Sequence, residues 1–224
     1  MSLPRAVRAV VFDMDGLLVD TETIAREVMT QAAEALGREL PYDVFLRMVG
    51  MNFAASGKIL AAHYGDGFDV DAFWTESTRR YQTALAAGVA LKAGVLELLD
   101  YLDQEGIPRA VATSSPHHDV DRNLGQHELR QRFDAVVARG DYEHGKPAPD
   151  PFLKAAAALG VEPSHCLALE DSHNGIRAAH AAGMMAVMVP DLLEATDEIR
   201  ALCARVIESL HDVQDLIAAS EELS

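Results

Sequence analysis

The chain has 224 residues, about one and a half times a typical domain, so its length predicts one core with an insertion or two small domains. Its 35 Asp and Glu against 19 Lys and Arg give a net charge of −16, which argues against a nucleic-acid or membrane partner, because phosphate groups are bound by clustered Lys and Arg. With 49% hydrophobic and 24% charged residues, the chain can bury a core, which excludes a disordered protein.

The first predicted element is a strand over residues 7–12. This short run is rich in Val, which is typical of a strand buried on both faces of a parallel sheet. From Asp20 onward the apolar residues recur at helical spacing, with Thr21 as the candidate cap of a helix that stops at Gly37. Residues 20–91 are predicted to be an all-helical insertion, because three more helices are expected before any further strand, near residues 43–49, 53–63 and 70–87.

Helices and strands alternate after the insertion. A helix over residues 95–105 is striped with Val and Leu and ends at Gly106. Strands are predicted over residues 109–112, 133–138, 166–169 and 185–189. The helices that accompany them start at Pro116 and cover residues 150–159, 174–182, 194–202 and 213–219. The predicted fold class is α/β, with a Rossmann-like parallel core from residues 1–19 and 92–224 and an inserted helical cap domain over residues 20–91.

Polar clusters follow the predicted strands, and in open α/β sheets ligands bind outside the carboxyl ends of the strands. The first cluster is Asp13 and Asp15. Two carboxylates at this spacing can bind a hard cation, or one can act as a nucleophile while the other transfers protons. An acidic turn without chemistry is the alternative interpretation.

The second cluster is Thr113-Ser114-Ser115. A hydroxyl at a strand end, followed by the backbone N–H groups of a helix start, forms an anion site. The alternative is ordinary helix capping, because Ser115 directly precedes Pro116.

The third cluster is Lys146, which Pro147 biases toward an extended backbone. Pro149 and Pro151 stiffen the loop that presents this lysine. A lysine held in this way is a fixed positive charge for a phosphoryl oxygen, and a solvated surface lysine is the alternative.

The fourth cluster is Glu170-Asp171, after an apolar predicted strand. Adjacent acids at a buried strand end are costly without a cation, so we expect them to complete an oxygen-rich Mg²⁺ site with Asp13 and Asp15. The alternative is capping of the next helix, which a neighbouring Ser or Asn could provide equally well. Together the clusters supply what phosphoryl transfer requires: acids, a hydroxyl with an anion site, and a fixed lysine.

These clusters resemble the ordered motifs of the haloacid dehalogenase superfamily, and within it the branch of β-phosphoglucomutase-like phosphatases. The segments that carry the resemblance are DMDGLLVDT (13–21), VATSS (111–115), GKPAPD (145–150) and LEDS (169–172). The resemblance spans nearly the whole core, and the helical insertion matches the cap of that branch.

The resemblance implies a role for each residue in the reaction. Asp13 would be the nucleophile that forms an aspartyl-phosphate. Asp15 would protonate the leaving alkoxide and then deprotonate the attacking water. Thr113 and the N–H of Ser114 would hold phosphoryl oxygens, and Lys146 would neutralise charge on the phosphoryl group and on the nucleophile.

The resemblance also implies Mg²⁺ as the cofactor. Asp13 and Asp171 would bind the ion directly, as would the backbone carbonyl of Asp15. Glu170 would support the metal shell. The metal set implied by the family is therefore Asp13, Asp15, Asp171 and Glu170.

Some residues of this chain differ from those of other members of the superfamily, and these differences limit which reaction it can catalyse. Dehalogenases of the superfamily lack the second acid, so Asp15 argues against haloacid chemistry. β-Phosphoglucomutase carries a His on its first cap helix and an Arg in the next cap loop, where this chain has Ala25 and residues 50–53 without an Arg. The sequence therefore favours hydrolysis of a small phosphate monoester, such as a phosphosugar, over a phosphosugar mutase. A phospho-accepting signalling module of the receiver type is the alternative from another class, which the cap and the acid pair on the first strand disfavour.

Several features bear on location and partners. Cys166 and Cys203 are too few for a disulfide framework and fit a reducing compartment. No run approaches the roughly 18 apolar residues of a membrane span, and the first four residues lack the pattern of a signal peptide. We therefore expect a cytoplasmic protein, a monomer by default, whose partner is a small phosphorylated metabolite.

Overall fold

The computed structural model describes residues 3–51, 53–65 and 67–221. The chain divides into two compact units. The α/β unit runs to Val19 and resumes at Leu91, and the helical unit spans Asp20–Ala90.

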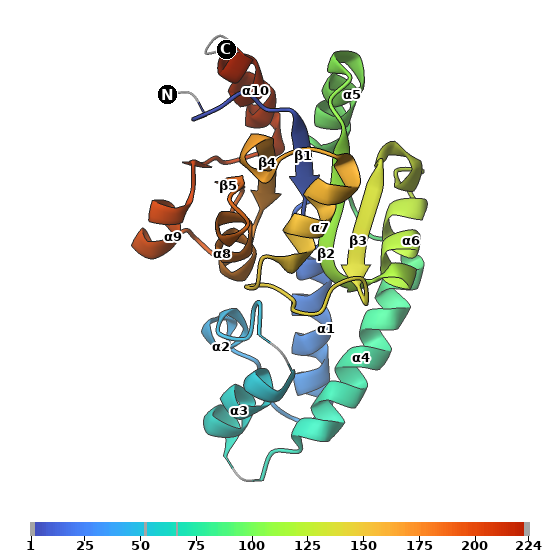
Figure 1. The fold of residues 1–224 in the computed structure, drawn as a ribbon. Helices are drawn as coiled ribbons and strands as arrows, with labels where there is room; N and C mark the ends of the chain where they lie inside the picture. Colours follow the sequence, from blue (N-terminus) through green and yellow to red (C-terminus); the bar gives the residue numbers. More distant parts are fainter. Residues whose placement is uncertain (1–2, 52, 66, 222–224) are drawn as a thin grey trace. The chain divides into compact units, whose positions relative to one another are not determined.

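The α/β unit is built on one parallel sheet of 6 strands (Figure 1). Their order across the sheet is β3-β2-β1-β4-β5-β6. The strands are β1 (Ala9–Phe12), β2 (Arg109–Pro116), β3 (Ala135–Arg139), β4 (Cys166–Glu170), β5 (Met185–Met188) and β6 (Arg205–Val206). The predicted α/β class is confirmed, and β6 is an edge strand of 2 residues that the sequence did not predict.

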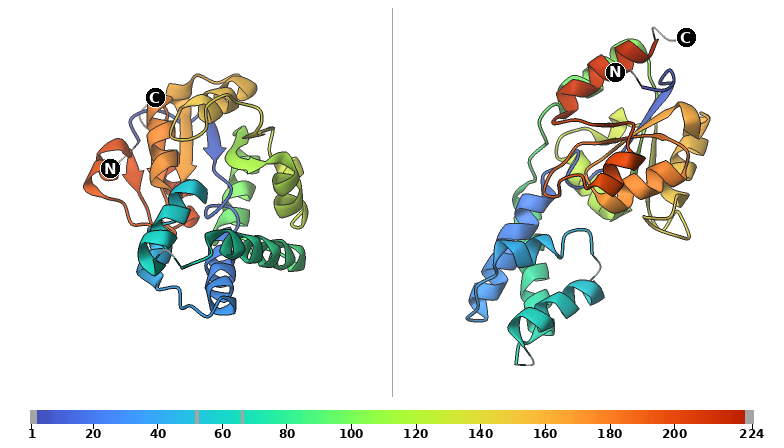
Figure 2. Two further views of the ribbon diagram at one scale, coloured as in Figure 1. Left: turned by 90° about the horizontal axis from the view of Figure 1, so that it is seen from below. Right: turned by 90° about the vertical axis from the view of Figure 1, so that its left-hand side faces the viewer.

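Helices cover both faces of this sheet (Figure 2). Helices α7 (Asp150–Leu159), α8 (His173–Ala181) and α9 (Asp197–Leu202) share one apolar cluster with β1, β2, β4 and β5. The other face carries α5 (Val95–Glu105), α6 (His117–Gly125) and α10 (Val213–Glu221). Short 3-10 helices complete the unit at Arg130–Arg132, Pro163–His165 and Leu210–Asp212. This division follows from right-handed crossovers, because the chain moves outward from β1 to β3 and then returns to the other side of β1 as β4.

The strand order decides which loops meet. β1 lies between β2 and β4, so the carboxyl ends of these strands are neighbours although they are far apart in sequence. The chain reverses its direction across the sheet at this place, which is where open α/β sheets bind ligands. The first, second and fourth polar clusters all follow these three strands.

The helical unit consists of α1 (Thr21–Ala35), α2 (Tyr42–Leu46), α3 (Phe53–Tyr64) and α4 (Val70–Ala87). The expected cap at Thr21 is wrong: Asp20 is the N-cap, and its Oδ1 accepts a hydrogen bond from the N–H of Thr23 at 3.4 Å. Asp is at least as good a cap as Thr, because its carboxylate also interacts favourably with the helix dipole. The described helices include none that is long and apolar enough to cross a membrane.

The second strand is longer than expected. The prediction ended it at Ala112, but β2 runs on to Pro116, with a register shift against β3 after Ala112. Ser115 was a candidate cap of the next helix, and this too is wrong, because the N-cap is Pro116 and makes no side-chain hydrogen bond. The hydroxyl of Ser115 is used elsewhere in the site.

Two glycines offer a matched test of packing at the ends of α5. Gly94 precedes the helix with φ 86°, and a Cβ there would lie 2.7 Å from the backbone nitrogen of His211. Gly106 follows the helix with φ 65°, and a Cβ there would have no atom within 4 Å. We predict that Gly94→Ala lowers the free energy of unfolding by about 2–4 kcal/mol, whereas Gly106→Ala costs only about 1 kcal/mol of backbone strain. Urea unfolding of the two variants checks this, and equal losses would contradict it.

Candidate active site

The site is assembled from the carboxyl ends of three strands and one loop. Asp13 directly follows β1, Thr113 lies in the last half of β2, and Glu170 is the last residue of β4. Lys146 comes from the loop before α7. All four side chains are buried, and burial of the three charged ones, Asp13, Lys146 and Glu170, requires that they be paired.

Lys146 joins two of the predicted acids. Its Nζ lies 2.5 Å from Oδ1 of Asp13 and 2.6 Å from Oε1 of Glu170, and its side chain is only 6% exposed. The ring of Phe152 lies beneath the ammonium group, with 5.0 Å from Nζ to the ring centroid. The alternative of a solvated surface lysine is thereby wrong for this structure.

Glu170 is held on both of its carboxylate oxygens. Oε1 accepts from Lys146, and Oε2 accepts from the backbone N–H and from the hydroxyl of Ser172, both at 2.9 Å. The same hydroxyl caps α8 by accepting from the N–H of Gly175 at 3.0 Å. Ser172 therefore serves both the helix start and the buried acid, a coupling that sequence reasoning missed.

Gly175 is a second residue that sequence reasoning missed. A Cβ at this position would lie 1.7 Å from Oε1 of Glu170 and 1.8 Å from its Cδ. The carboxylate thus occupies the space that any other residue would need. The only signal in the sequence was a glycine in the first turn of a helix, where glycine is otherwise unfavourable.

The pKa values of Asp13 and Lys146 are both raised, for different reasons. Burial raises the pKa of Asp13 to about 8, and although Lys146 lowers it, the nearby carboxylates of Glu170 and Asp15 raise it further. For Lys146, burial lowers the pKa, but Asp13 and Glu170 more than offset this, so its pKa is raised and it stays charged. The buried lysine is therefore outnumbered by carboxylates, and additional positive charge would favour the ionised form of Asp13.

A group of three acids could hold a metal ion. Asp13, Glu170 and Asp171 each offer a carboxylate oxygen, and these atoms all lie within 4.8 Å of one another. Carboxylate oxygens are the ligands that hard divalent cations prefer. The side chains of three of the four predicted metal ligands, Asp13, Glu170 and Asp171, thus lie close together.

The carboxylate of Asp15 lies instead with the second cluster. Its Oδ2 accepts a hydrogen bond from the hydroxyl of Ser115 at 2.6 Å and lies 3.5 Å from Oγ1 of Thr113. The N–H of Ser115 in turn donates to Oγ1 of Thr113 at 3.0 Å. Ser115 therefore links Asp15 to the end of β2, and sequence reasoning had assigned it only a capping role.

The second cluster is anchored from the loop that carries Lys146. The hydroxyl of Tyr142 donates to the backbone carbonyl of Thr113 at 3.1 Å, and burial raises the pKa of Tyr142. Ser114, the predicted phosphate ligand, is exposed, whereas Thr113 is buried. At this strand end Ser114 is therefore exposed to solvent, while the hydrogen bond from Tyr142 holds the backbone of Thr113 in place.

The model of the haloacid dehalogenase-like hydrolases matches residues 7–183 of the chain. The chain belongs to this family. The predicted family and the predicted enzyme class, a phosphoric monoester hydrolase, are confirmed.

Several relatives of the chain are named as phosphatases. A probable pseudouridine-5'-phosphatase from Drosophila melanogaster is 36% identical over 217 residues, which cover 93% of this chain and 92% of the relative. Hexitol phosphatase B from Escherichia coli O157:H7 is 31% identical over 224 residues, covering 92% and 93%. Among solved structures, a hydrolase of the same family from Deinococcus radiodurans R1, with bound phosphate and sodium, is 27% identical with a TM-score of 0.84 and covers 96% of both chains.

The contact between Gly175 and Glu170 can be tested with a matched pair of variants. We predict that Gly175→Ala lowers the free energy of unfolding by about 2–4 kcal/mol and reduces phosphatase activity more than tenfold, because the methyl group displaces a buried and fully bonded carboxylate. Gly125→Ala in α6 is the control, since a Cβ there meets nothing within 4 Å. Thermal melts and steady-state rates of both variants are compared; a stable and active Gly175→Ala protein would contradict the assignment.

Proposed function

We propose that the protein is a Mg²⁺-dependent phosphatase that hydrolyses a small phosphate monoester, such as a phosphosugar, through an aspartyl-phosphate on Asp13. The observation that carries the proposal is the ion pair of Lys146 with Asp13 and Glu170, beside the third carboxylate of Asp171. The similarity to named phosphatases supports the substrate class. We further propose that the enzyme is a cytoplasmic monomer without a nucleic-acid or membrane partner. The net charge of −16 supports the absence of these two partners, because both are anionic.

In this proposal the chain's own residues bind and orient the phosphoryl group. Thr113 and the N–H of Ser114 hold phosphoryl oxygens, and the ammonium of Lys146 offsets negative charge on them. Asp13 attacks the phosphorus, so that a bond forms to one of its oxygens as the bond to the leaving oxygen breaks. Because Lys146 engages Oδ1 of Asp13, the carboxylate is fixed in orientation before substrate arrives.

The acids at the carboxyl ends of β1 and β4 fit a divalent cation. Asp13 and Asp171 would hold it directly together with the backbone carbonyl of Asp15, and Glu170 would support the metal shell while it accepts from Lys146 and Ser172. When bound, Mg²⁺ supplies positive charge that favours the ionised nucleophile and screens it from the phosphate anion. Burial raises the pKa of Asp13 to about 8, and a cation beside this carboxylate would lower that pKa.

Asp15 transfers the protons in both halves of the reaction. It donates a proton to the leaving oxygen in the first half and removes one from the attacking water in the second, so its charge is restored after each turnover. The hydroxyl of Ser115 can donate to the ionised carboxylate and accept from the protonated one. Ser115 is therefore suited to hold Asp15 in both protonation states.

The mutase alternative depends on the helical unit. Ala25 lies in α1, where β-phosphoglucomutase carries a His, and this position has no titratable group. In the segment 50–53, Asn52 lies outside the described residues, and Met51 and Phe53 are exposed apolar side chains. Neither Ala25 nor residues 50–53 carry the His or the Arg of the mutase, so hydrolysis is the function we propose.

The nucleophile and the metal are tested together. We predict that Asp13→Asn lowers the rate of phosphate release by at least about 10³-fold with Mg²⁺ present, over a panel of phosphosugars, nucleotides and phosphoglycolate. Thorough chelation of the wild-type protein by EDTA abolishes release, and added Mg²⁺ restores it.

The controls separate this proposal from its rivals. A thermal melt shows that the Asn variant is folded, and phosphorus NMR of the wild-type products separates hydrolysis from isomerisation. Substantial release by Asp13→Asn, or full activity in EDTA, would overturn the mechanism. A long-lived phospho-Asp13 with negligible turnover would favour the signalling module.

Ser115 is tested by the leaving-group dependence of the rate. We predict that Ser115→Ala lowers kcat/KM for an alkyl phosphate by about 10–100-fold, because its alkoxide needs a well-placed acid. The loss is smaller for p-nitrophenyl phosphate, whose leaving group needs little protonation. Ser115→Thr is the control that keeps the hydroxyl and retains activity on both. Equal losses on the two substrates would show that Ser115 does not act through Asp15.

A further inference from the structure

Tyr142 has no part in the proposed reaction, yet its hydroxyl contacts the segment that would bind the phosphoryl group. The hydroxyl donates to the backbone carbonyl of Thr113 at 3.1 Å. Burial raises the pKa of Tyr142, and a hydrogen bond from the side chain of Ser114 acts in the opposite direction. One phenol oxygen therefore contacts both residues that a single peptide bond joins.

This peptide bond links the carbonyl of Thr113 to the N–H of Ser114. The bond is trans, so both groups lie in one plane and point in opposite directions. The hydrogen bond from Tyr142 therefore fixes the direction of the N–H of Ser114 as well as that of the carbonyl. Because the carbonyl faces the phenol, the N–H points away from it.

The strand order indicates what lies on the other side. β2 lies between β3 and β1, and the backbone groups of a strand point toward its two neighbours in the sheet. Tyr142 comes from the loop that follows β3, whereas Asp13 follows β1. A carbonyl of Thr113 that is held from the β3 side leaves the N–H of Ser114 directed toward the β1 side, where the nucleophile lies.

The loop that carries Tyr142 is fixed by its own hydrogen bonds. The N–H of Asp141 donates to the carbonyl of Ala138 at 3.0 Å, and Oδ2 of Asp141 accepts from the N–H of Ala138 at 2.8 Å. The same carboxylate lies 2.9 Å from Nε2 of His117, and the ring of Tyr142 packs against the apolar core. The consecutive residues Asp141 and Tyr142 thus hold the segment 113–117 at its last and its first residue.

We propose that Tyr142 is a positioning residue of the phosphate site: its hydroxyl orients the peptide unit between Thr113 and Ser114 so that the N–H of Ser114 meets a phosphoryl oxygen. This inference rests on the proposed function, which assigns that N–H to the phosphoryl group. The hydrogen bond also polarises the peptide unit, which makes its N–H a stronger donor. A donor that is oriented before substrate arrives stabilises the charge that develops in the transition state.

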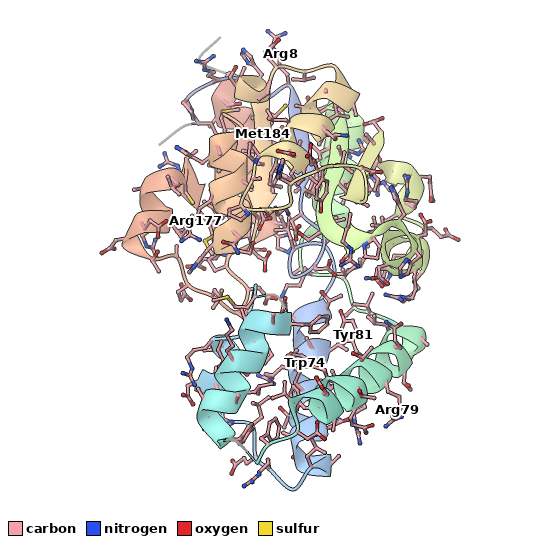
Figure 3. The ribbon with its side chains drawn as sticks, turned by 60° about the horizontal axis from the view of Figure 1, so that its bottom comes forward. Arg8, Trp74, Arg79, Tyr81, Arg177 and Met184 are labelled. Atoms are coloured by element: carbon pink, nitrogen blue, oxygen red, sulfur yellow. The ribbon has the colours of Figure 1, made fainter. Side chains whose placement is uncertain are left out.

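The helical unit supplies a matched control. It has aromatic side chains of its own, including Trp74 and Tyr81 of α4, which Figure 3 labels. Tyr64, the last residue of α3, donates through its hydroxyl to the backbone carbonyl of Glu39 at 2.7 Å, and the proposed reaction uses neither residue. Tyr142→Phe and Tyr64→Phe each remove one such bond to a carbonyl, so we expect similar small drops in melting temperature.

The first experiment requires no turnover and follows the N–H of Ser114 itself. Protein labelled with ¹⁵N-serine is titrated with inorganic phosphate in the presence of Mg²⁺, and the signal of Ser114 is assigned by its loss in Ser114→Ala. We expect a saturable downfield shift in the parent protein and in Tyr64→Phe. In Tyr142→Phe the shift should shrink and the Kd of phosphate should rise about fivefold. An unchanged shift and Kd in Tyr142→Phe would overturn the proposal.

The second experiment separates orientation of the donor from a general loss of stability. Tyr142→Phe should lower kcat/KM for p-nitrophenyl phosphate and weaken orthovanadate, a mimic of trigonal-bipyramidal phosphorus, by the same factor of about ten. Tyr64→Phe should leave both values unchanged at the same temperature. A loss of activity in Tyr142→Phe without weaker binding of vanadate would contradict a positioning role.

The role of Tyr142 and the proposed phosphatase reaction fail in different ways. If the parent protein turns over substrate but Tyr142→Phe matches it in every measurement, the role of Tyr142 is wrong and the reaction stands. If phosphate shifts the Ser114 signal in a manner that depends on Tyr142, but no substrate releases phosphate, the reaction is wrong and the role of Tyr142 stands. No effect of phosphate on Ser114 in the parent protein would overturn the role of Tyr142, whatever the turnover.

Discussion

The ammonium group of Lys146 lies between the carboxylates of Asp13 and Glu170, and the rest of the site depends on this arrangement. A buried lysine is tolerated only when its charge is compensated, and here the compensation comes from the ends of two adjacent strands. The loop before α7 is thereby held against the ends of β1 and β4, at the place where the chain reverses its direction across the sheet. Removing Lys146 would leave the carboxylates of Asp13 and Glu170 buried without the positive charge that they share.

Glu170 connects this ion pair to the packing of the core. Its carboxylate fills the space that a side chain at position 175 would need, and it accepts hydrogen bonds from Ser172. The first turn of α8 therefore packs directly against the acid. The site holds more carboxylates than its lysine balances, and these charges add to burial in raising the pKa of Asp13. This local excess accounts for part of the net charge of −16, and in the proposed function it is compatible with an anionic substrate, because a cation together with Lys146 would make the pocket attractive to phosphate.

Elements with a strong period could be predicted closely from the sequence. The structure begins and ends α4 at Val70 and Ala87 and α7 at Asp150 and Leu159, as expected from apolar spacing and from the Asp-Pro start of α7. Two of the errors fall where pairing between strands decides. β6 has 2 residues and is a strand only because β5 lies beside it, and β2 extends past Ala112 only because β3 continues alongside.

The sequence by itself determined the family, the α/β class and the residue types of the chemistry, because motif order and hydrophobic period are local properties that survive without coordinates. Only the tertiary structure decided which of these residues touch. Lys146 and Asp13 are 133 positions apart and Ser115 and Asp15 are 100 apart, so their contacts depend on the order in which the strands pair.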